Sequence, residues 1–146
     1  VFGGIVMTQE DKDLLLKDLC SRLPYGVKIQ TDYTDVKTLE GIQFPDYIGI
    51  SDGYCSLDDM ECKPYLFPLS SMTKEQYEEW CDLEAEPLDE ILTRNANGEK
   101  MSTLEHHLLI AKSLTDSVNY CYKNHFDIYG LIPMGLAEDA TGLNIY

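Results

Sequence analysis

Two amphipathic helices are the clearest elements that the pattern of hydrophobic and polar positions predicts. The first apolar stripe consists of Leu15, Leu16, Leu19, Cys20 and Leu23. Its spacing predicts a helix over residues 9–22, with Thr8 as N-cap and with Pro24 and Gly26 as the signals that end it. The second stripe consists of Leu104, His107, Leu108, Ala111, Leu114, Val118 and Cys121. It predicts a long packing helix over residues 103–122, which Ser102 and Glu105 begin with a capping box.

Between these helices, alternation of apolar and polar residues predicts a small, mostly antiparallel sheet. The candidate strands cover residues 27–31, 47–51, 54–57 and 65–67, with a shorter one near residues 36–39. Asp52-Gly53 lies between two of them and is a strong signal for a two-residue hairpin turn. Pro64 and Pro68 bracket the run at 65–67 and favour an edge strand or an extended connector there.

An acidic helix is expected after the sheet, because Thr73 and Gln76 have the spacing of a capping box. We predict this helix over residues 73–83 and a separate helical turn over residues 87–93. Residues 125–146 are expected to form short turns. These elements predict a single α+β domain over residues 7–146: an N-terminal helix, the sheet, the acidic helix and the long packing helix. Residues 1–6 are interpreted as a remnant of cloning or of upstream sequence.

A net charge of −15 is the property of the composition that most restricts function. It repels phosphate backbones, so we expect no direct nucleic-acid binding. Three interpretations remain open: a solvated acidic surface, a surface for a basic protein partner, and a decoy that imitates nucleic acid. No apolar run reaches the roughly 20 residues of a membrane span, so no membrane association is expected.

The five cysteines are odd in number and scattered along the chain. Cys55 and Cys62 are too far apart for the C-x2-4-C pattern of a zinc site. We therefore expect the cysteines to be reduced, small and buried, as in a cytoplasmic protein. The first six residues are too short for a signal peptide and lack its basic region.

Candidate metal or catalytic residues are few, and no cofactor is expected. His106 and His107 are adjacent, so on a helix their side chains point about 100° apart and do not converge easily on one ion. We expect His107 in the core, on the apolar stripe, and His106 exposed. Asp52, Asp58 and Asp59 lack the order of a calcium-binding loop, and a metal-assisted hydrolase requires them to converge with a histidine. The glycine-rich patterns that bind phosphate are absent from the sequence.

The acidic stretch around Glu75 to Glu90 is the candidate protein-binding surface. Its proposed contact residues are Glu75, Glu78, Glu79, Trp80 and Asp82. Several carboxylates lie at i, i+3 or i+4, where like charges destabilise a helix, and tolerance of that cost favours a functional acidic face. Trp80 is the candidate aromatic anchor. We therefore expect a non-enzymatic interaction module with an unidentified protein partner. The alternatives are a DNA-mimic inhibitor of a nucleic-acid-binding protein and a small metal-assisted hydrolase.

The segment of residues 126–137 is dense in apolar side chains for a loop. It is either a lid packed onto the core or an exposed recognition patch, where aromatic and methionine side chains are enriched. The sequence leaves both interpretations open.

Three segments together resemble a family of small proteins from gut Bacteroides-type bacteria and their phages. The segments are residues 19–28 (LCSRLPYGVK), 63–73 (KPYLFPLSSMT) and 125–137 (HFDIYGLIPMGLA). The resemblance covers most of residues 7–140, and Met7 matches the usual start of the family. It implies a bacterial or phage cytoplasmic protein. It supplies no activity and therefore no site residues. Separately, we expect the interaction module to be an accessory protein of a mobile element or phage.

Overall fold

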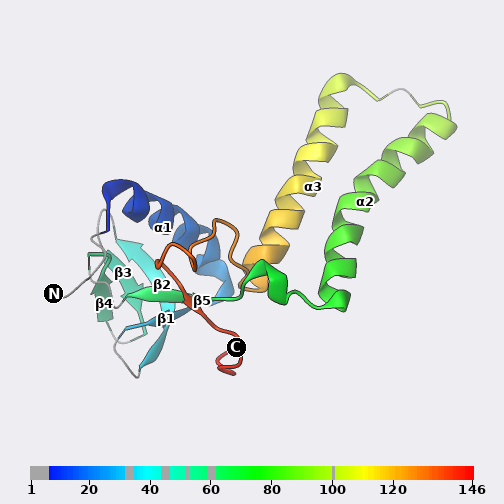
Figure 1. Cartoon of the computed structure of the whole chain (residues 1–146). Coiled ribbons are helices and arrows are strands. Elements are labelled where there is room, and N and C mark those ends of the chain that lie inside the picture. The colour runs from blue at the N-terminus through cyan, green and yellow to red at the C-terminus, as the bar shows by residue number, and fades with distance from the viewer. Residues whose placement is uncertain (1–6, 32–34, 44–46, 52, 59–61, 100) are drawn as a thin grey trace. The chain divides into compact units, whose positions relative to one another are not determined.

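The computed structural model describes residues 7–31, 35–43, 47–51, 53–58, 62–99 and 101–146 (Figure 1). The contacts divide the chain into two compact units. The first unit is Val1–Ser71 with His125–Tyr146, and the second is Met72–Asn124. The second unit is therefore an insertion between two parts of the first. That residues 7–146 form one domain stays a prediction.

Helix α1, Gln9–Arg22, has the predicted boundaries. The Thr8 side chain accepts a hydrogen bond from the Asp11 N–H, and the Asp11 carboxylate accepts one from the Thr8 N–H. The helix runs into a 3-10 turn, Leu23–Tyr25, after which the chain turns at Gly26 with a φ of 66°. Glycine has no Cβ to strain in this left-handed conformation.

The buried face of α1 differs in part from the predicted stripe. Leu15, Leu16 and Leu19 are buried as expected, but Cys20 is exposed. The rest of the buried face is formed by Asp18 and Arg22. These two residues lie one turn apart on the same side as Leu15, whereas Cys20 points about 140° away from it.

The first unit contains a six-stranded sheet in the order β4-β3-β2-β1-β5-β6. The strands are β1 Lys28–Gln30, β2 Val36–Gln43, β3 Tyr47–Ile50, β4 Gly53–Ser56, β5 Lys63–Leu66 and β6 Glu138–Asp139. The neighbouring pairs from β4 to β5 are antiparallel, and β6 runs parallel to β5. The predicted α+β class with a mostly antiparallel sheet is therefore confirmed.

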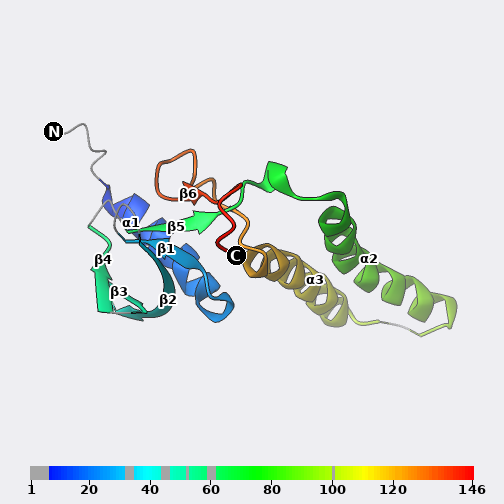
Figure 2. The ribbon, with the colours of Figure 1, turned by 90° about the horizontal axis from the view of Figure 1, so that it is seen from below.

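Strand β5 is not the edge strand that its prolines suggested. It lies between β1 and β6, which the view of Figure 2 shows on either side of it. Pro64 pairs with Ile29 of β1, while β6 pairs with the next two residues, Tyr65 and Leu66. The missing N–H of Pro64 therefore lies outside the short ladder with β6. Strand β6 has only two residues, which are too few to show an alternating pattern in the sequence.

The core of the first unit combines α1, the sheet and the C-terminal segment. Its buried cluster is Leu15, Leu16, Leu19, Val27, Ile29, Leu39, Ile48, Leu57, Cys62, Leu66, Leu131, Leu136 and Ala137. Phe126 is also buried, and Tyr129 and Ile132 pack against the cluster. Of the two interpretations of residues 126–137, the structure supports the packed one.

The second unit is a pair of helices, α2 (Lys74–Ala96) and α3 (Thr103–Lys123), which run in opposite directions (Figure 1). The predicted capping box of α2 is present: the Gln76 N–H donates to Thr73 Oγ1, and the Thr73 N–H donates to Gln76 Oε1. At the start of α3, the Ser102 side chain accepts from the Glu105 N–H.

Helix α2 is continuous through Pro87, so the predicted division into a helix and a separate turn is wrong. A proline inside a helix has no N–H for the carbonyl four residues earlier, which here is that of Leu83. Ser113 of α3 donates its hydroxyl to this oxygen at 3.2 Å. The neighbouring helix thus supplies the donor that Pro87 lacks.

Candidate functional site

Polar contacts fix α2 against α3 along the second unit. The Trp80 indole N–H donates to the Ser117 carbonyl at 3.2 Å, and the Tyr120 hydroxyl donates to Glu79 Oε2 at 2.8 Å. Burial and then the bond to Glu79 raise the pKa of Tyr120 to about 12, so its hydroxyl keeps its proton at neutral pH. Together with the Ser113 hydroxyl, these contacts make the serine side of α3 the side that packs on α2.

The structure separates the five predicted contact residues into two groups. Glu75, Glu78 and Asp82 are exposed, as a binding surface requires. Glu79 is exposed but accepts the Tyr120 hydrogen bond, and Trp80 is half-buried and donates to α3. These last two residues therefore serve the packing of the hairpin. That Trp80 also anchors a partner stays a prediction.

Tyr77 is an aromatic residue of this surface that the list of candidates omitted. Its ring centroid lies 6.2 Å from that of Trp80, and 56% of the residue is exposed. The ring stands one turn before Trp80, at i−3, and the spacing alone could have indicated an aromatic pair. The exposed ring beside the carboxylates is therefore Tyr77.

The acidic surface of α2 runs along residues 75–90, the range expected from the sequence. Its exposed carboxylates, which we call the acidic row, are Glu75, Glu78, Glu79, Asp82, Glu86, Asp89 and Glu90. Their positions fall within a face about 120° wide. Beside the row lies a groove of about 450 Å³. The groove is lined by Leu83, Glu86, Pro87, Asp89, Glu90, Thr93, Arg94, Leu109, Lys112 and Asp116.

The two basic residues of α2 do not neutralise most of the negative charge of the acidic row. Lys74 lies 4.0 Å from Glu78, with both side chains largely exposed. Such surface pairs contribute little. Arg94 binds Glu99 at 3.0 Å and Glu105 at 3.1 Å, neither of which belongs to the acidic row.

Six of the seven residues of the predicted apolar stripe of α3 face solvent, and Cys121 alone is buried, so the prediction that this helix buries its stripe is wrong except at Cys121. The exposed residues, which we call the α3 stripe, are Leu104, Leu108, Ile110, Leu114 and Val118, with exposed fractions of 42–68%. Around the helix, Leu104, Leu108 and Val118 lie about 140–180° from Ser113. Leu114 and Ile110 lie nearer to it, at about 100° and 60°. The side of α3 that meets α2 therefore carries Ser113 and Tyr120, and Leu109 lines the groove shared with α2.

The histidine and aspartate candidates do not form a metal site among the residues that the structure describes. His107 is exposed and His106 is half-buried, the reverse of what we expected, because the stripe that holds His107 faces solvent. Asp58 forms an ion pair with Lys12 at 2.6 Å. Asp52 and Asp59 lie outside the described residues. In the described part of the chain, no three His, Cys, Asp or Glu side chains are grouped to hold an ion.

Cys55 and Cys62 form a disulfide, so the expectation of five reduced cysteines is wrong for this pair. The disulfide joins the end strand β4 to the residue before β5, with the two Cα atoms 6.4 Å apart. Of the other three, Cys20 is exposed, Cys81 is half-buried and Cys121 is buried. Only Cys121 has the full burial that was expected of these three.

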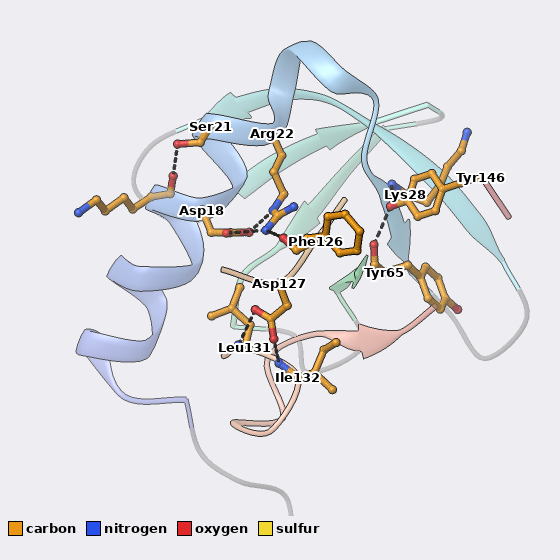
Figure 3. A network of polar contacts seen from close by, with 11 residues as sticks. Asp18, Ser21, Arg22, Lys28, Tyr65, Phe126, Asp127, Leu131, Ile132 and Tyr146 are labelled. Carbon is orange, nitrogen blue, oxygen red and sulfur yellow. Dashed lines mark hydrogen bonds and ion pairs between the residues drawn. The ribbon is translucent and has the colours of Figure 1, made fainter. Parts of the chain in front are cut away.

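A buried polar network in the first unit is the other candidate site (Figure 3). Arg22 binds Asp18 through two hydrogen bonds, Nε to Oδ2 at 2.6 Å and Nη2 to Oδ1 at 3.1 Å. Its Nη2 also donates to the Phe126 carbonyl at 2.6 Å. Burial raises the pKa of the Asp18 carboxyl, and the hydrogen bond from Arg22 acts in the opposite direction. Neither side chain is accessible to solvent.

The neighbouring polar groups hold the C-terminal segment in the same way. Asp127 accepts hydrogen bonds from the N–H groups of Leu131 and Ile132 at 2.8 and 3.0 Å. The Tyr146 hydroxyl donates to the Tyr65 carbonyl at 2.6 Å and accepts from the Lys28 N–H at 2.9 Å (Figure 3). The network thus ties residues 126–146 to α1 and to the sheet, which is a structural role.

His125 begins this segment in an unusual environment. Its φ is 63°, and its ring stacks on that of Tyr146 with centroids 3.7 Å apart. Burial, with a smaller effect of the nearby Arg22 and Lys28 charges, lowers the pKa of His125 to about 4. The imidazole is therefore neutral at physiological pH. Within the described chain, its buried Nδ1 has no hydrogen-bond partner.

Comparison with protein-family models, with curated proteins and with solved structures found no match. The described helices include none that is long and apolar enough to cross a bilayer. Of the two candidate sites, the polar network of the first unit holds its own elements together. The surface of the hairpin presents charge and apolar side chains to solvent.

Proposed function

We propose that the protein is a non-enzymatic interaction module that binds a basic protein partner through the acidic row of α2. The observation that carries this proposal is the exposure of seven carboxylates on one helix face, with its two cations paired weakly or elsewhere. A surface of one sign attracts and orients a partner of opposite charge. The groove beside the row adds apolar lining from Leu83, Pro87 and Leu109 for a side chain of that partner.

Glu75, Glu78 and Asp82 are the residues through which this proposal is best tested. All three are exposed, and they lie at the same end of α2 as Tyr77. Glu79 is a poorer choice, because reversing its charge also removes the hydrogen bond from Tyr120 that holds α3 against α2. The interaction should weaken with salt, since exposed charges are screened over about 8 Å at physiological ionic strength.

Capture from a Bacteroides-type lysate tests the proposal with matched variants. The test variant carries Glu75→Lys, Glu78→Lys and Asp82→Lys. The control carries Glu10→Lys, Asp13→Lys and Glu40→Lys, which change the net charge equally at exposed sites of the first unit. We expect the native protein and the control to retain the same basic protein and the test variant to lose it. Retention by the test variant, or capture of no partner by the native protein, contradicts the proposal.

A DNA-mimic inhibitor is the second candidate, and the charge spacing favours it. At 1.5 Å per residue, the seven carboxylates of the acidic row extend over about 22 Å, roughly one charge per 3–4 Å. A single DNA strand carries one charge per about 3.4 Å. If this function is correct, the protein displaces a labelled duplex from a basic nucleic-acid-binding protein of the lysate. Failure to displace it from any heparin-binding fraction removes this candidate.

We keep a bacterial or phage cytoplasmic location, and a role as an accessory protein of a mobile element, as part of the proposal. The support is the resemblance of residues 19–28, 63–73 and 125–137 to the Bacteroides-type family. The Cys55–Cys62 disulfide argues against it, because disulfides are rare in reducing compartments. Alkylation of the protein in acid-quenched cells, followed by mass spectrometry, tests the location. Five alkylated cysteines support a reducing compartment, and an intact disulfide contradicts it.

A further inference from the structure

We propose that the groove beside the acidic row takes an arginine side chain of the basic partner. This inference rests on the proposed function and adds to it the place where the partner inserts a side chain and the kind of side chain that fits. The groove is lined by residues of α2 and α3 alone, and its volume of about 450 Å³ is in the usual range of ligand pockets. It therefore lies within the second unit.

The lining of this groove combines negative charge with apolar surface. Its carboxylates come from both helices, three from α2 and one from α3: Glu86, Asp89, Glu90 and Asp116. The apolar part consists of Leu83, Pro87 and Leu109. An arginine matches both parts, because its aliphatic stem packs on apolar surface while its charged end stays in contact with water.

Charge complementarity identifies the occupant of the groove as a cation. Among the described residues, none of its four carboxylates forms an ion pair or a side-chain hydrogen bond. Two basic residues, Arg94 and Lys112, also line the groove, so four acidic against two basic residues give a formal charge of −2. Arg94 is held by Glu99 and Glu105, which lie outside the lining. The groove carboxylates therefore remain available to a partner of opposite charge.

The division of the carboxylates between two helices favours arginine over lysine. Glu86 and Glu90 are one turn apart on α2, and Asp116 belongs to the neighbouring helix. A guanidinium is planar, weakly hydrated and rich in N–H donors, so it can bind carboxylates of both helices at once. A lysine ammonium is a compact, strongly hydrated charge, and it gains less from leaving water for a groove with an apolar wall. We therefore expect the groove to distinguish the two cations.

Titration of labelled peptides with the full chain tests the inference. One probe is a fluorescein-labelled peptide with four arginines spaced by glycine and alanine, and the other has lysine at the same positions. At about 0.15 M salt, fluorescence anisotropy should give the native chain a Kd on the order of 10 μM for the arginine peptide and about tenfold weaker binding of the lysine peptide. Equal Kd values for the two peptides overturn the assignment to arginine.

Two triple variants locate the binding along α2. The groove variant carries Glu86→Gln, Asp89→Asn and Glu90→Gln, and the control carries Glu75→Gln, Glu78→Gln and Asp82→Asn. Each removes three negative charges from exposed positions of the same helix. The groove variant should bind the arginine peptide about tenfold more weakly than the native chain and lose the preference over lysine. The control should keep that preference, with a Kd within about threefold of the native value. Equal effects of the two variants overturn the inference.

A second pair of variants blocks the groove without a change of charge. Thr93 is exposed and lines the groove, whereas Thr115 is exposed on α3 outside the lining. Thr93→Tyr should weaken binding of the arginine peptide about fivefold, because the ring fills the groove, and Thr115→Tyr should leave it unchanged. Threonine and tyrosine have similar helix propensities, so both variants should fold, which far-UV circular dichroism verifies. Native-like binding by Thr93→Tyr overturns the inference, and it decides the question if the groove variant does not fold.

Failure of this inference is distinguishable from failure of the proposed function. The proposed function fails if the charge reversals at Glu75, Glu78 and Asp82 leave capture of the partner unchanged. The inference about the groove fails if the native chain shows no preference for the arginine peptide, or if the variants of the groove bind it like their controls. That second failure leaves the proposed function intact when the charge reversals still abolish capture of the partner.

Discussion

The hydrogen bond from Ser113 to Leu83 predicts a specific dependence between Ser113 and Pro87. Pro87 lacks the N–H that normally bonds to the Leu83 carbonyl, and the Ser113 hydroxyl occupies that oxygen at 3.2 Å. Ser113→Ala leaves the carbonyl without this donor. Ser113 is 8% exposed, so water reaches the site poorly. We expect Ser113→Ala to lower the free energy of unfolding by about 1–2 kcal/mol.

The same substitution should cost much less after Pro87→Ala. Residue 87 then has an N–H of its own, four residues beyond Leu83, and the helix can supply the missing donor. We expect Ser113→Ala to cost less than about 0.5 kcal/mol in this background, which gives a coupling energy of about 1 kcal/mol. Urea unfolding followed by Trp80 fluorescence measures it in the second unit, because Trp80 is the single tryptophan of the chain.

Thr115→Ala is the control for loss of a hydroxyl from α3. The Thr115 hydroxyl donates to Ala111 within its own helix at 2.9 Å, and Thr115 is exposed. Its loss should change stability by no more than about 0.5 kcal/mol in either background. An equal cost of Ser113→Ala with and without Pro87 refutes the reasoning, because the hydroxyl then does not replace the missing N–H.

Other variants test the first unit and its relation to the second. Arg22→Met leaves the buried Asp18 carboxylate without its partner, and urea unfolding should show a loss of about 3–5 kcal/mol; a loss below about 1 kcal/mol contradicts the account. The pKa of His125 is lowered from 6.5 to about 4, so the unfolded chain takes up its proton first as the pH falls. The neutral imidazole therefore contributes its full share of the free energy of unfolding above pH 6.5, and this share is lost as the pH falls towards 4. We expect the loss to be about 1–2 kcal/mol, because the partial exposure of His125 reduces the effect. Asparagine tolerates the φ of 63° at this position, so His125→Asn should remove the loss of stability at low pH. An unchanged pH dependence in this variant refutes the role of His125. If residues 7–146 form one domain, Trp80 fluorescence and far-UV circular dichroism report a single transition, and two separate transitions contradict this.

Local signals in the sequence were sufficient for elements whose ends are determined by nearby residues. The bounds of α1 follow from Thr8, the leucine spacing and Gly26, and the start of α2 follows from Thr73 and Gln76. These contacts span at most four residues, so they are visible in a short window. The alternation of apolar and polar residues indicated β1 to β5, although β2 is longer than predicted and β5 begins two residues earlier. Strand β6, which has two residues, was not predicted.

Features that depend on distant residues could not be predicted in this way. The continuity of α2 through Pro87 depends on a hydroxyl 30 positions from Leu83. The period of α3 shows that one face is apolar, but which face meets α2 depends on the serine contacts. Exposure of Glu75, Glu78 and Asp82 was predictable from charge. The contact of Trp80 with Ser117 was not, because it joins two helices.

The affinity of the captured partner for matched charge variants is the most direct test of the claim that the acidic row of α2 is the binding surface. Calorimetric titration should give equal Kd values for the native chain and for the control with reversals at Glu10, Asp13 and Glu40. The variant with reversals at Glu75, Glu78 and Asp82 should bind at least tenfold more weakly, and its remaining affinity should depend less on salt. Equal affinity of the two triple variants, with the same salt dependence, contradicts the claim.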